Sequence, residues 1–166
     1  MIHKFNIHDL DWQEWGRGPR FQASRKPLTP KTDPAPKIGA SLYRLAPGKR
    51  AFPRHYHAAN DEAVFILKGT GTLLYGAAEY DVAPGDYVHL PAGTGEAHQL
   101  VNTGEADLEY LCFSSMIEPE VTVYPDSDKV GIFTGRAPGS PVARAGATVE
   151  ILRHETADYW DGEEER

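Results

Sequence analysis

The chain has 166 residues, with 16 glycines, 13 prolines, a single cysteine and a formal net charge of −7. This length is typical of one domain with its own core, and the turn-rich composition favours an all-β protein over a helix bundle. A lone Cys112 excludes an intrachain disulfide framework, and the acidic balance argues against nucleic acid as a partner because such a chain repels phosphate backbones.

The same features predict a soluble, cytoplasmic protein without a membrane partner. A single cysteine is typical of a reducing compartment, and every apolar run falls short of the roughly 20 residues of a membrane span. The start of the chain, residues 1–5, lacks the apolar stretch and small-residue cleavage site of a signal peptide. We expect three parts: an N-terminal arm (1–37), a barrel core (38–118) and a C-terminal extension (119–166) that packs on the core.

The arm is expected to dock through its apolar residues, without a regular helix or central strand near its end. Prolines recur between residues 26 and 37, and each removes a backbone donor and restricts φ. They are Pro27, Pro30, Pro34 and Pro36, and the apolar residues before them are Phe5, Ile7, Leu10, Trp12, Trp15 and Phe21.

The middle of the chain reads as short strands separated by turns. Pro47-Gly48, Pro84-Gly85 and Pro91-Ala-Gly93 interrupt β-compatible runs at regular spacing, a pattern typical of a sandwich or barrel. The expected strands cover residues 38–45, 52–57, 62–67, 72–75, 79–82, 86–90, 97–102 and 108–115.

The C-terminal part predicts three further strands, over residues 121–124, 129–133 and 148–153. A Gly/Pro/Ala loop over residues 135–146 separates the last two. The closing Asp158-Tyr-Trp-Asp161 is expected to pack its two rings, while the acidic end, Asp161 to Glu165, stays solvated.

Two histidines one residue apart give the chain its strongest chemical signal. Side chains alternate across a strand, so His55 and His57 project from one face, within reach of one ion. A carboxylate from Glu62 and a third imidazole from His98 would complete a set suited to one divalent Mn, Fe, Co, Ni, Cu or Zn ion. On a six-coordinate ion, four ligands leave two positions for water or substrate.

Each residue also has a structural interpretation. A single histidine is more often hydrogen-bonded or exposed than a ligand, and Glu62 alone would be an ordinary solvated acid. Asp61, beside Glu62, is a competing ligand. The six-residue spacing from Glu62 to Gly69 and the apolar run over 63–67 favour Glu62.

The residues that frame the histidines resemble the two motifs of the cupin family. Gly48 to Gly69 is similar to the first motif, and Gly85 to Asn102 to the second, with His98 four positions before Asn102. Two spacings depart from the pattern. Six residues rather than five separate Gly48 from His55, and four rather than two separate Gly93 from His98. Both insertions fall in connections, where they change loop length more than ligand geometry.

The resemblance implies a cupin double-stranded β-helix, or jelly-roll, barrel that binds one metal ion near its mouth. It also implies a homodimer, to which the apolar arm would contribute. Flanking segments are similar to a group of stand-alone bacterial cupins, largely uncharacterised and sometimes labelled sugar-phosphate isomerase. Fold-level analogy alone does not assign that activity.

Other polar residues are secondary candidates, for which packing or solvation is the simpler interpretation. Several tyrosines and Gln99 could line a polar interior, three basic residues could hold a phosphate or carboxylate, and His89 could support the ligands. Cys112 is expected to act as a small buried hydrophobe, and His3, His8 and His154 have no ligand spacing. The tyrosines are Tyr43, Tyr56, Tyr75, Tyr87 and Tyr110, and the basic residues are Lys49, Arg50 and Arg54.

Three functions are consistent with these residues, and the sequence singles out no catalytic group beyond the metal ligands. The first is a metal-dependent enzyme for a small polar metabolite, resembling a sugar-phosphate isomerase, in which the ion polarises adjacent carbonyl and hydroxyl oxygens. The second is a metal-dependent dioxygenase, which would consume oxygen. The third is a non-catalytic module that binds or senses a small molecule.

Overall fold

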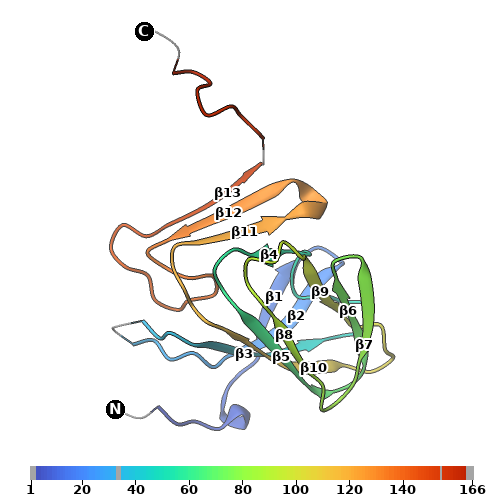
Figure 1. The fold of residues 1–166 in the computed structure, drawn as a ribbon. Coiled ribbons are helices and arrows are strands. Elements are labelled where there is room, and N and C mark those ends of the chain that lie inside the picture. The colour runs from blue at the N-terminus through green and yellow to red at the C-terminus, as the bar shows by residue number, and fades with distance from the viewer. Residues whose placement is uncertain (1–2, 33–34, 154, 164–166) are drawn as a thin grey trace.

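The computed structural model describes residues 3–32, 35–153 and 155–163, and these form a nearly all-β protein (Figure 1). Two short 3-10 helices, η1 (Ile7–Asp9) and η2 (Pro125–Ser127), accompany the strands. The strands are β1 (Gln13–Arg17), β2 (Phe21–Pro27), β3 (Gly39–Leu45), β4 (Tyr56–His57), β5 (Glu62–Lys68), β6 (Gly71–Tyr75), β7 (Ala78–Val82), β8 (Tyr87–Leu90), β9 (His98–Val101), β10 (Leu108–Ser114), β11 (Glu120–Tyr124), β12 (Lys129–Thr134) and β13 (Thr148–Arg153).

The strands form three antiparallel sheets that enclose one interior. A six-stranded sheet has the order β1-β2-β3-β10-β5-β8, a four-stranded sheet has the order β13-β12-β11-β4, and a three-stranded sheet has the order β7-β6-β9. An isolated antiparallel bridge between His55 and His98 joins the two smaller sheets beside β4 and β9. The bridge therefore closes the wall opposite the large sheet, as the predicted jelly-roll barrel requires.

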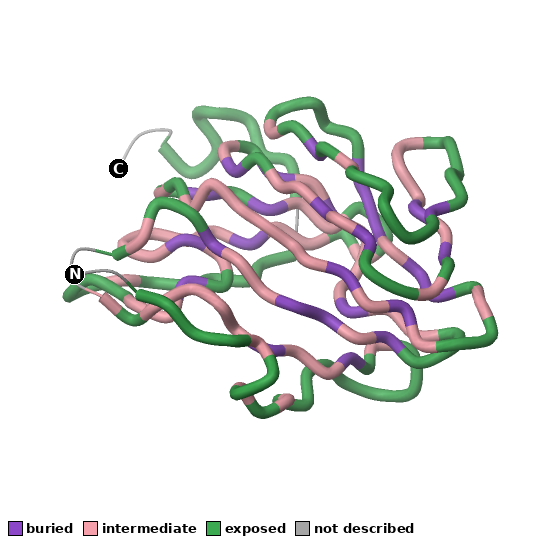
Figure 2. The backbone as a smooth tube through the Cα atoms, turned by 90° about the horizontal axis from the view of Figure 1, so that it is seen from below, coloured by how far each residue is buried: buried purple, intermediate pink, exposed green. Residues whose placement is uncertain are grey.

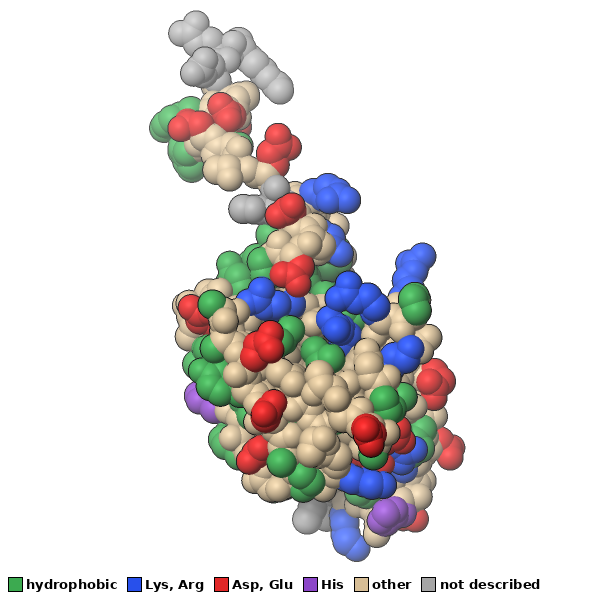
Figure 3. All heavy atoms as spheres, turned by 90° about the vertical axis from the view of Figure 1, so that its right-hand side faces the viewer, with side chains coloured by type: hydrophobic (Ala, Val, Ile, Leu, Met, Phe, Trp, Pro, Cys, Tyr) green, Lys and Arg blue, Asp and Glu red, His purple; other side chains and the backbone are tan. Residues whose placement is uncertain are grey.

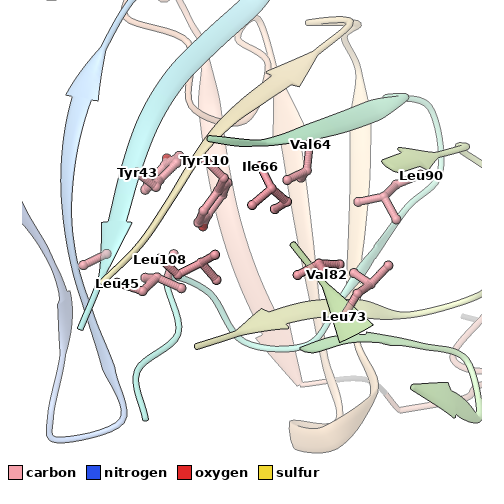
Figure 4. Packing of buried hydrophobic residues seen from close by; sticks show 11 residues of the cluster. Tyr43, Leu45, Val64, Ile66, Leu73, Val82, Leu90, Leu108 and Tyr110 are labelled. Carbon is pink, nitrogen blue, oxygen red and sulfur yellow. The ribbon is translucent and has the colours of Figure 1, made fainter. Parts of the chain in front are cut away.

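The alternation of side chains along the central strands determines which residues face this interior. In β5, Val64 and Ile66 are buried, so Glu62 at the same phase points to the same face. Apolar side chains fill the closed end of the barrel (Figure 4), and Leu45, Ile66 and Leu108 are fully buried. Each contributes about 1.5–3 kcal/mol by its removal from water. Many of the buried positions lie on the central strands, whereas the C-terminal segment is exposed (Figure 2).

The predicted strands of the core and the extension lie within a few residues of the observed ones, with one exception. The expected strand over residues 52–57 is reduced to Tyr56–His57 and the bridge at His55. Pro53 accounts for this, because proline cannot donate to a ladder.

The arm adds a β-hairpin that the sequence did not predict. β1 pairs with β2, and β2 pairs with β3 from Ser24↔Arg44 to Pro27↔Ser41, so the arm extends the large sheet. Pro27 occupies the last position of β2, where a missing donor is tolerated. Pro34 lies outside the described residues.

Outside the barrel, the end of the chain diverges from the body (Figure 1). The rings of Tyr159 and Trp160 meet edge to face with centroids 4.8 Å apart, yet 84% and 63% of these residues are exposed. They pack on each other and remain largely exposed to solvent. Residues 164–166, in the predicted acidic end, lie outside the described residues. No helix in the described ranges is long and apolar enough to span a membrane.

Two residues of the cupin-like motifs have clear structural roles. Gly69 has a φ of +78°, and a Cβ there would approach the Asp107 carbonyl oxygen to 2.3 Å, so only glycine fits. Asn102 is fully buried. Its Nδ2 donates to the carbonyls of Leu45 (2.7 Å) and Ala106 (2.9 Å), and its Oδ1 accepts from the Gly104 amide at 3.0 Å. Asn102 thereby ties three connections together at the closed end.

Replacing Asn102 by alanine is expected to destabilise the fold by about 2–4 kcal/mol, because buried carbonyls and an amide lose their partners. Urea unfolding measures the change, with exposed Thr103→Ala as the control. A loss below about 0.5 kcal/mol would contradict the role assigned to Asn102.

Candidate metal centre

The structure brings all four predicted ligands together inside the barrel. His55 and His57 come from β4 and the residue before it, Glu62 begins β5, and His98 begins β9. One potential ligand atom from each lies within 4.8 Å of all the others. The three histidines are buried and Glu62 is partly buried.

The donor set fits a single divalent ion with little adjustment. Ligands bound at about 2.0–2.2 Å lie at most roughly 4.4 Å apart across the ion, so a small contraction is sufficient. Glu62 Oε2 is 3.1 Å from His98 Nε2, and Glu62 Oε1 is 3.6 Å from His57 Nε2. Within the described structure, His57 Nε2 is buried and has no hydrogen-bond partner. A buried ring nitrogen directed at a carboxylate and two further imidazoles is what metal ligation would satisfy.

His55 is set up as a neutral ligand. Its Nδ1 lies 2.8 Å from the Pro53 carbonyl oxygen, to which it donates, so Nε2 carries the free lone pair. Burial, together with the neighbouring His98, lowers the pKa of His55 to about 4. The ring is therefore neutral at physiological pH, the form that binds a metal ion.

A buried acid that the sequence analysis missed supports His57 from behind. Glu120, in β11, places Oε2 at 3.6 Å from His57 Nδ1. Burial alone would lower the pKa of His57, but the nearby carboxylates of Glu120 and Glu62 raise it. A carboxylate behind a ligand imidazole fixes the ring and increases its basicity, as around many metal ions.

Glu120 also organises the connection between the two parts of the first motif. Its carboxylate accepts backbone N–H groups from Ala58 (2.9 Å), Ala59 (3.2 Å) and Asn60 (2.7 Å), and the side-chain amide of Asn60 also donates to it. Burial raises the pKa of Glu120, but the nearby His57 and hydrogen bonds from Asn60 and Ala59 outweigh it and lower the pKa to about 2. One ionised side chain thus positions both His57 and the segment leading to Glu62.

Glu62 is ionised as well. Burial would raise its pKa, but the hydrogen bond with His98 and the nearby His57 and His55 lower it to about 2. The competing residue Asp61 points elsewhere, since its carboxylate accepts the Ala92 amide at 2.9 Å on the surface. The structure therefore favours Glu62 over Asp61.

Three of the four cluster residues, His55, His57 and Glu62, line a cavity of about 280 Å³, close to the lower limit for small-molecule sites. Tyr124, another residue missed at the sequence level, stacks on His55 with centroids 5.9 Å apart. Burial raises the pKa of both Tyr124 and Tyr43 above that of a free phenol, so both hydroxyls stay protonated at neutral pH. The wall is completed mainly by Trp15, Phe52, Phe113, Met116 and Phe133, with Arg25 at the arm.

The remaining tyrosine candidates and His89 separate into different places. Tyr110 is buried in the core and stacks on Tyr43. Tyr75, Tyr87 and His89 line another groove, between β6, β7 and β8, so His89 does not support the cluster. Tyr56 lies between the two histidines on β4.

Gln99 and the three basic candidates are occupied by protein partners. Gln99 donates to the Phe52 carbonyl at 2.6 Å and accepts from Arg50 at 3.0 Å. Lys49 donates to the Pro19 carbonyl at 2.7 Å, and Arg54 reaches the Gly76 carbonyl and Asp126. The three basic side chains are therefore not simply solvated, as the simpler interpretation expected, but also bind other groups of the protein.

The other secondary residues have no role in the cluster. Cys112 lines the cavity, and burial raises its pKa well above that of a free thiol, so it behaves as a small hydrophobe. His3 and His8 are exposed in the arm, and His154 lies outside the described residues. On the face shown in Figure 3, acidic and basic side chains are interspersed.

The fold and the cluster define an all-β barrel with an internal three-histidine, one-carboxylate candidate metal site. A family model described as the cupin domain matches residues 41–114. Residues 41–114 therefore form a cupin domain. The match contains both motif segments and all four candidate ligands.

Known proteins similar to the chain include a curated relative and solved structures. Auxin-binding protein 1 of Arabidopsis thaliana is 31% identical over 94 residues, 51% of this chain, which spans about half (46%) of that protein. A cupin superfamily sugar phosphate isomerase from Silicibacter pomeroyi superposes with a TM-score of 0.70 at 26% identity, covering 86% of this chain and 98% of that one. A cupin 2 conserved barrel domain protein from Rhodopseudomonas palustris gives 0.53 at 26% identity, covering 64% and 72%.

Proposed function

We propose that this protein is a metal-dependent enzyme that isomerises a small polar metabolite, with sugar phosphates as the first class to test. The observation that carries the proposal is the cluster of His55, His57, Glu62 and His98, three of which line a cavity large enough for a small molecule. The similarity to the Silicibacter pomeroyi sugar phosphate isomerase, over 86% of this chain and 98% of that one, supports the choice of substrate.

In this proposal, a bound divalent ion supplies Lewis acidity to the carbonyl and hydroxyl oxygens of the substrate. The protein's own side chains exclude water and hold protons. Tyr124 and Tyr43 keep their protons at neutral pH, so each can donate a hydrogen bond to a bound oxygen. The apolar wall of Phe52, Phe113 and Phe133 excludes water, which strengthens those hydrogen bonds.

A second candidate function, binding without catalysis, is favoured by the relative named as an auxin-binding protein. The cavity wall also lacks an obvious free base among the described residues. Tyr43, Tyr124 and Cys112 are protonated at neutral pH, and the remaining acid–base groups of the wall belong to the cluster.

The test incubates metal-loaded protein with aldose and ketose phosphates in deuterium oxide without oxygen and follows the products by proton NMR. Isomerisation predicts interconversion, or solvent deuterium at the carbon beside the carbonyl, that Glu62→Ala abolishes. Tight binding without either change would contradict the enzyme and support the binding module. Turnover that requires oxygen, measured with an oxygen electrode, would support the dioxygenase instead.

A further inference from the structure

The hairpin of the arm carries a cation into the cavity that holds the cluster. β2 pairs with β3 so that Arg25 lies opposite Tyr43, and Tyr43 lies opposite Tyr110 on β10. Paired residues share a face of the sheet, and both tyrosines are buried inside the barrel. Arg25 therefore faces the interior at the open end and lines the same cavity as His55, His57 and Glu62.

Neighbouring aromatic groups hold the Arg25 side chain in place. Its guanidinium carbon lies 4.3 Å from the centre of the Trp15 ring, and Tyr43 is its partner on the neighbouring strand. Trp15 is itself fixed, because its Nε1 donates to the Ala51 carbonyl at 3.2 Å. The guanidinium is thus oriented before any ligand arrives, which reduces the entropy lost on binding.

This guanidinium has no carboxylate partner within the described ranges. A planar guanidinium offers five donors to such a partner. Among the described residues of the cavity wall, Arg25 is the only arginine or lysine, and the one carboxylate there, Glu62, belongs to the cluster. A half-buried cation without a counter-charge, set among aromatic rings, is suited to an oxyanion.

We infer that Arg25 binds an anionic group of the substrate, a carboxylate or a phosphate, while the rest of the molecule extends along the aromatic wall toward the cluster. This inference rests on the proposed function only in placing the substrate in this cavity. The substrates are then small oxyanions, and the arm is the part of the chain that selects them.

The experiment titrates metal-loaded protein with glucose 6-phosphate, glucuronate and glucose, which share one body and differ in their charged group. Binding is followed by calorimetry and by tryptophan fluorescence, since Trp15 contacts Arg25. We expect at least one anion to bind about 10- to 100-fold more tightly than glucose, the range for a charged hydrogen bond. The stronger of the two anions identifies the group that the site takes.

Arg25→Met should abolish this preference, and Arg25→Lys should retain part of it, because the charge remains without the fork. Arg17→Met, an equal charge change on an exposed residue of the same hairpin, is the matched control and should bind like the wild type. Equal affinities for anions and glucose, no binding of either anion, or an anion preference that survives in Arg25→Met would each overturn the inference.

Repeating the titration on metal-free protein separates this inference from the proposed function. Arg25 is outside the cluster, so the part of the preference that Arg25→Met removes should persist without metal. If that part persists while no turnover is found with metal, the enzyme proposal fails and the anion site stands. If metal removal alone eliminates the preference, the anion was bound by the ion, and the assignment to Arg25 is wrong.

Discussion

Alanine at any one of the four clustered positions is expected to weaken metal binding at least about 100-fold, more than the 10- to 100-fold typical of supporting residues. His55, His57, Glu62 and His98 each offer one atom to the same small volume, so no neighbouring group replaces a lost ligand. The measurement is metal content after dialysis, together with affinity from competition against a chelator.

The matched control is His89→Ala, which removes an imidazole from the groove between β6, β7 and β8 and should leave metal content unchanged. Circular dichroism verifies that each variant is folded. Full metal occupancy in two or more of the four ligand variants would show that the site is assigned wrongly.

Glu120→Ala is expected to produce the largest loss of stability, about 3–5 kcal/mol at pH 7. Its carboxylate is buried and accepts three backbone N–H groups from Ala58, Ala59 and Asn60. Each donor that is left buried without a partner costs about 1–3 kcal/mol, offset in part where water enters the space. Urea unfolding of metal-free protein measures the loss, with exposed Glu79→Ala as a control expected to change stability by less than about 0.5 kcal/mol.

The acid dependence of this loss follows from the lowered pKa of Glu120. Its pKa is about 2 in the folded protein against an ordinary value of 4.5, so its charge favours the fold above pH 4.5. That contribution disappears as the pH falls from 4.5 toward 2. The stability gap between the wild type and Glu120→Gln should therefore narrow over this interval. A gap that is constant from pH 7 to pH 3 would contradict an ionised Glu120.

Much of the barrel could be predicted from local patterns. Turns at Pro47-Gly48, Pro84-Gly85 and Pro91-Ala-Gly93 separate strands whose alternation is visible in short windows. The ligands could be predicted for the same reason, since His55 and His57 share a strand face whatever the remaining fold is. The prediction of His98 as a ligand also required the second motif, because His98 is far from the other ligands in the sequence and is brought to them by its bridge to His55.

The features that were missed depend on partners far away in the sequence. The hairpin of β1 and β2 is stabilised by pairing with β3. The prolines at and after its end argued against strands in the arm. In β11, the polar side chains of Glu120 and Thr122 are buried, whereas Val121 is exposed. A strand whose polar residues alternate with exposed apolar ones can be recognised in the sequence as one that turns its polar side into the interior. It indicates a site only when the residues that face it across the barrel are known.

The metal centre is tested most directly by the metal content of protein purified without a histidine tag or chelator, measured by plasma mass spectrometry. We expect close to one divalent ion per chain, retained in His89→Ala and lost in His57→Ala. Iron or copper would direct the next assays to oxygen consumption, and zinc, manganese, nickel or cobalt to isomerisation. Protein that holds no metal, even after incubation with each of these ions, would contradict the metal centre and the enzyme proposed from it.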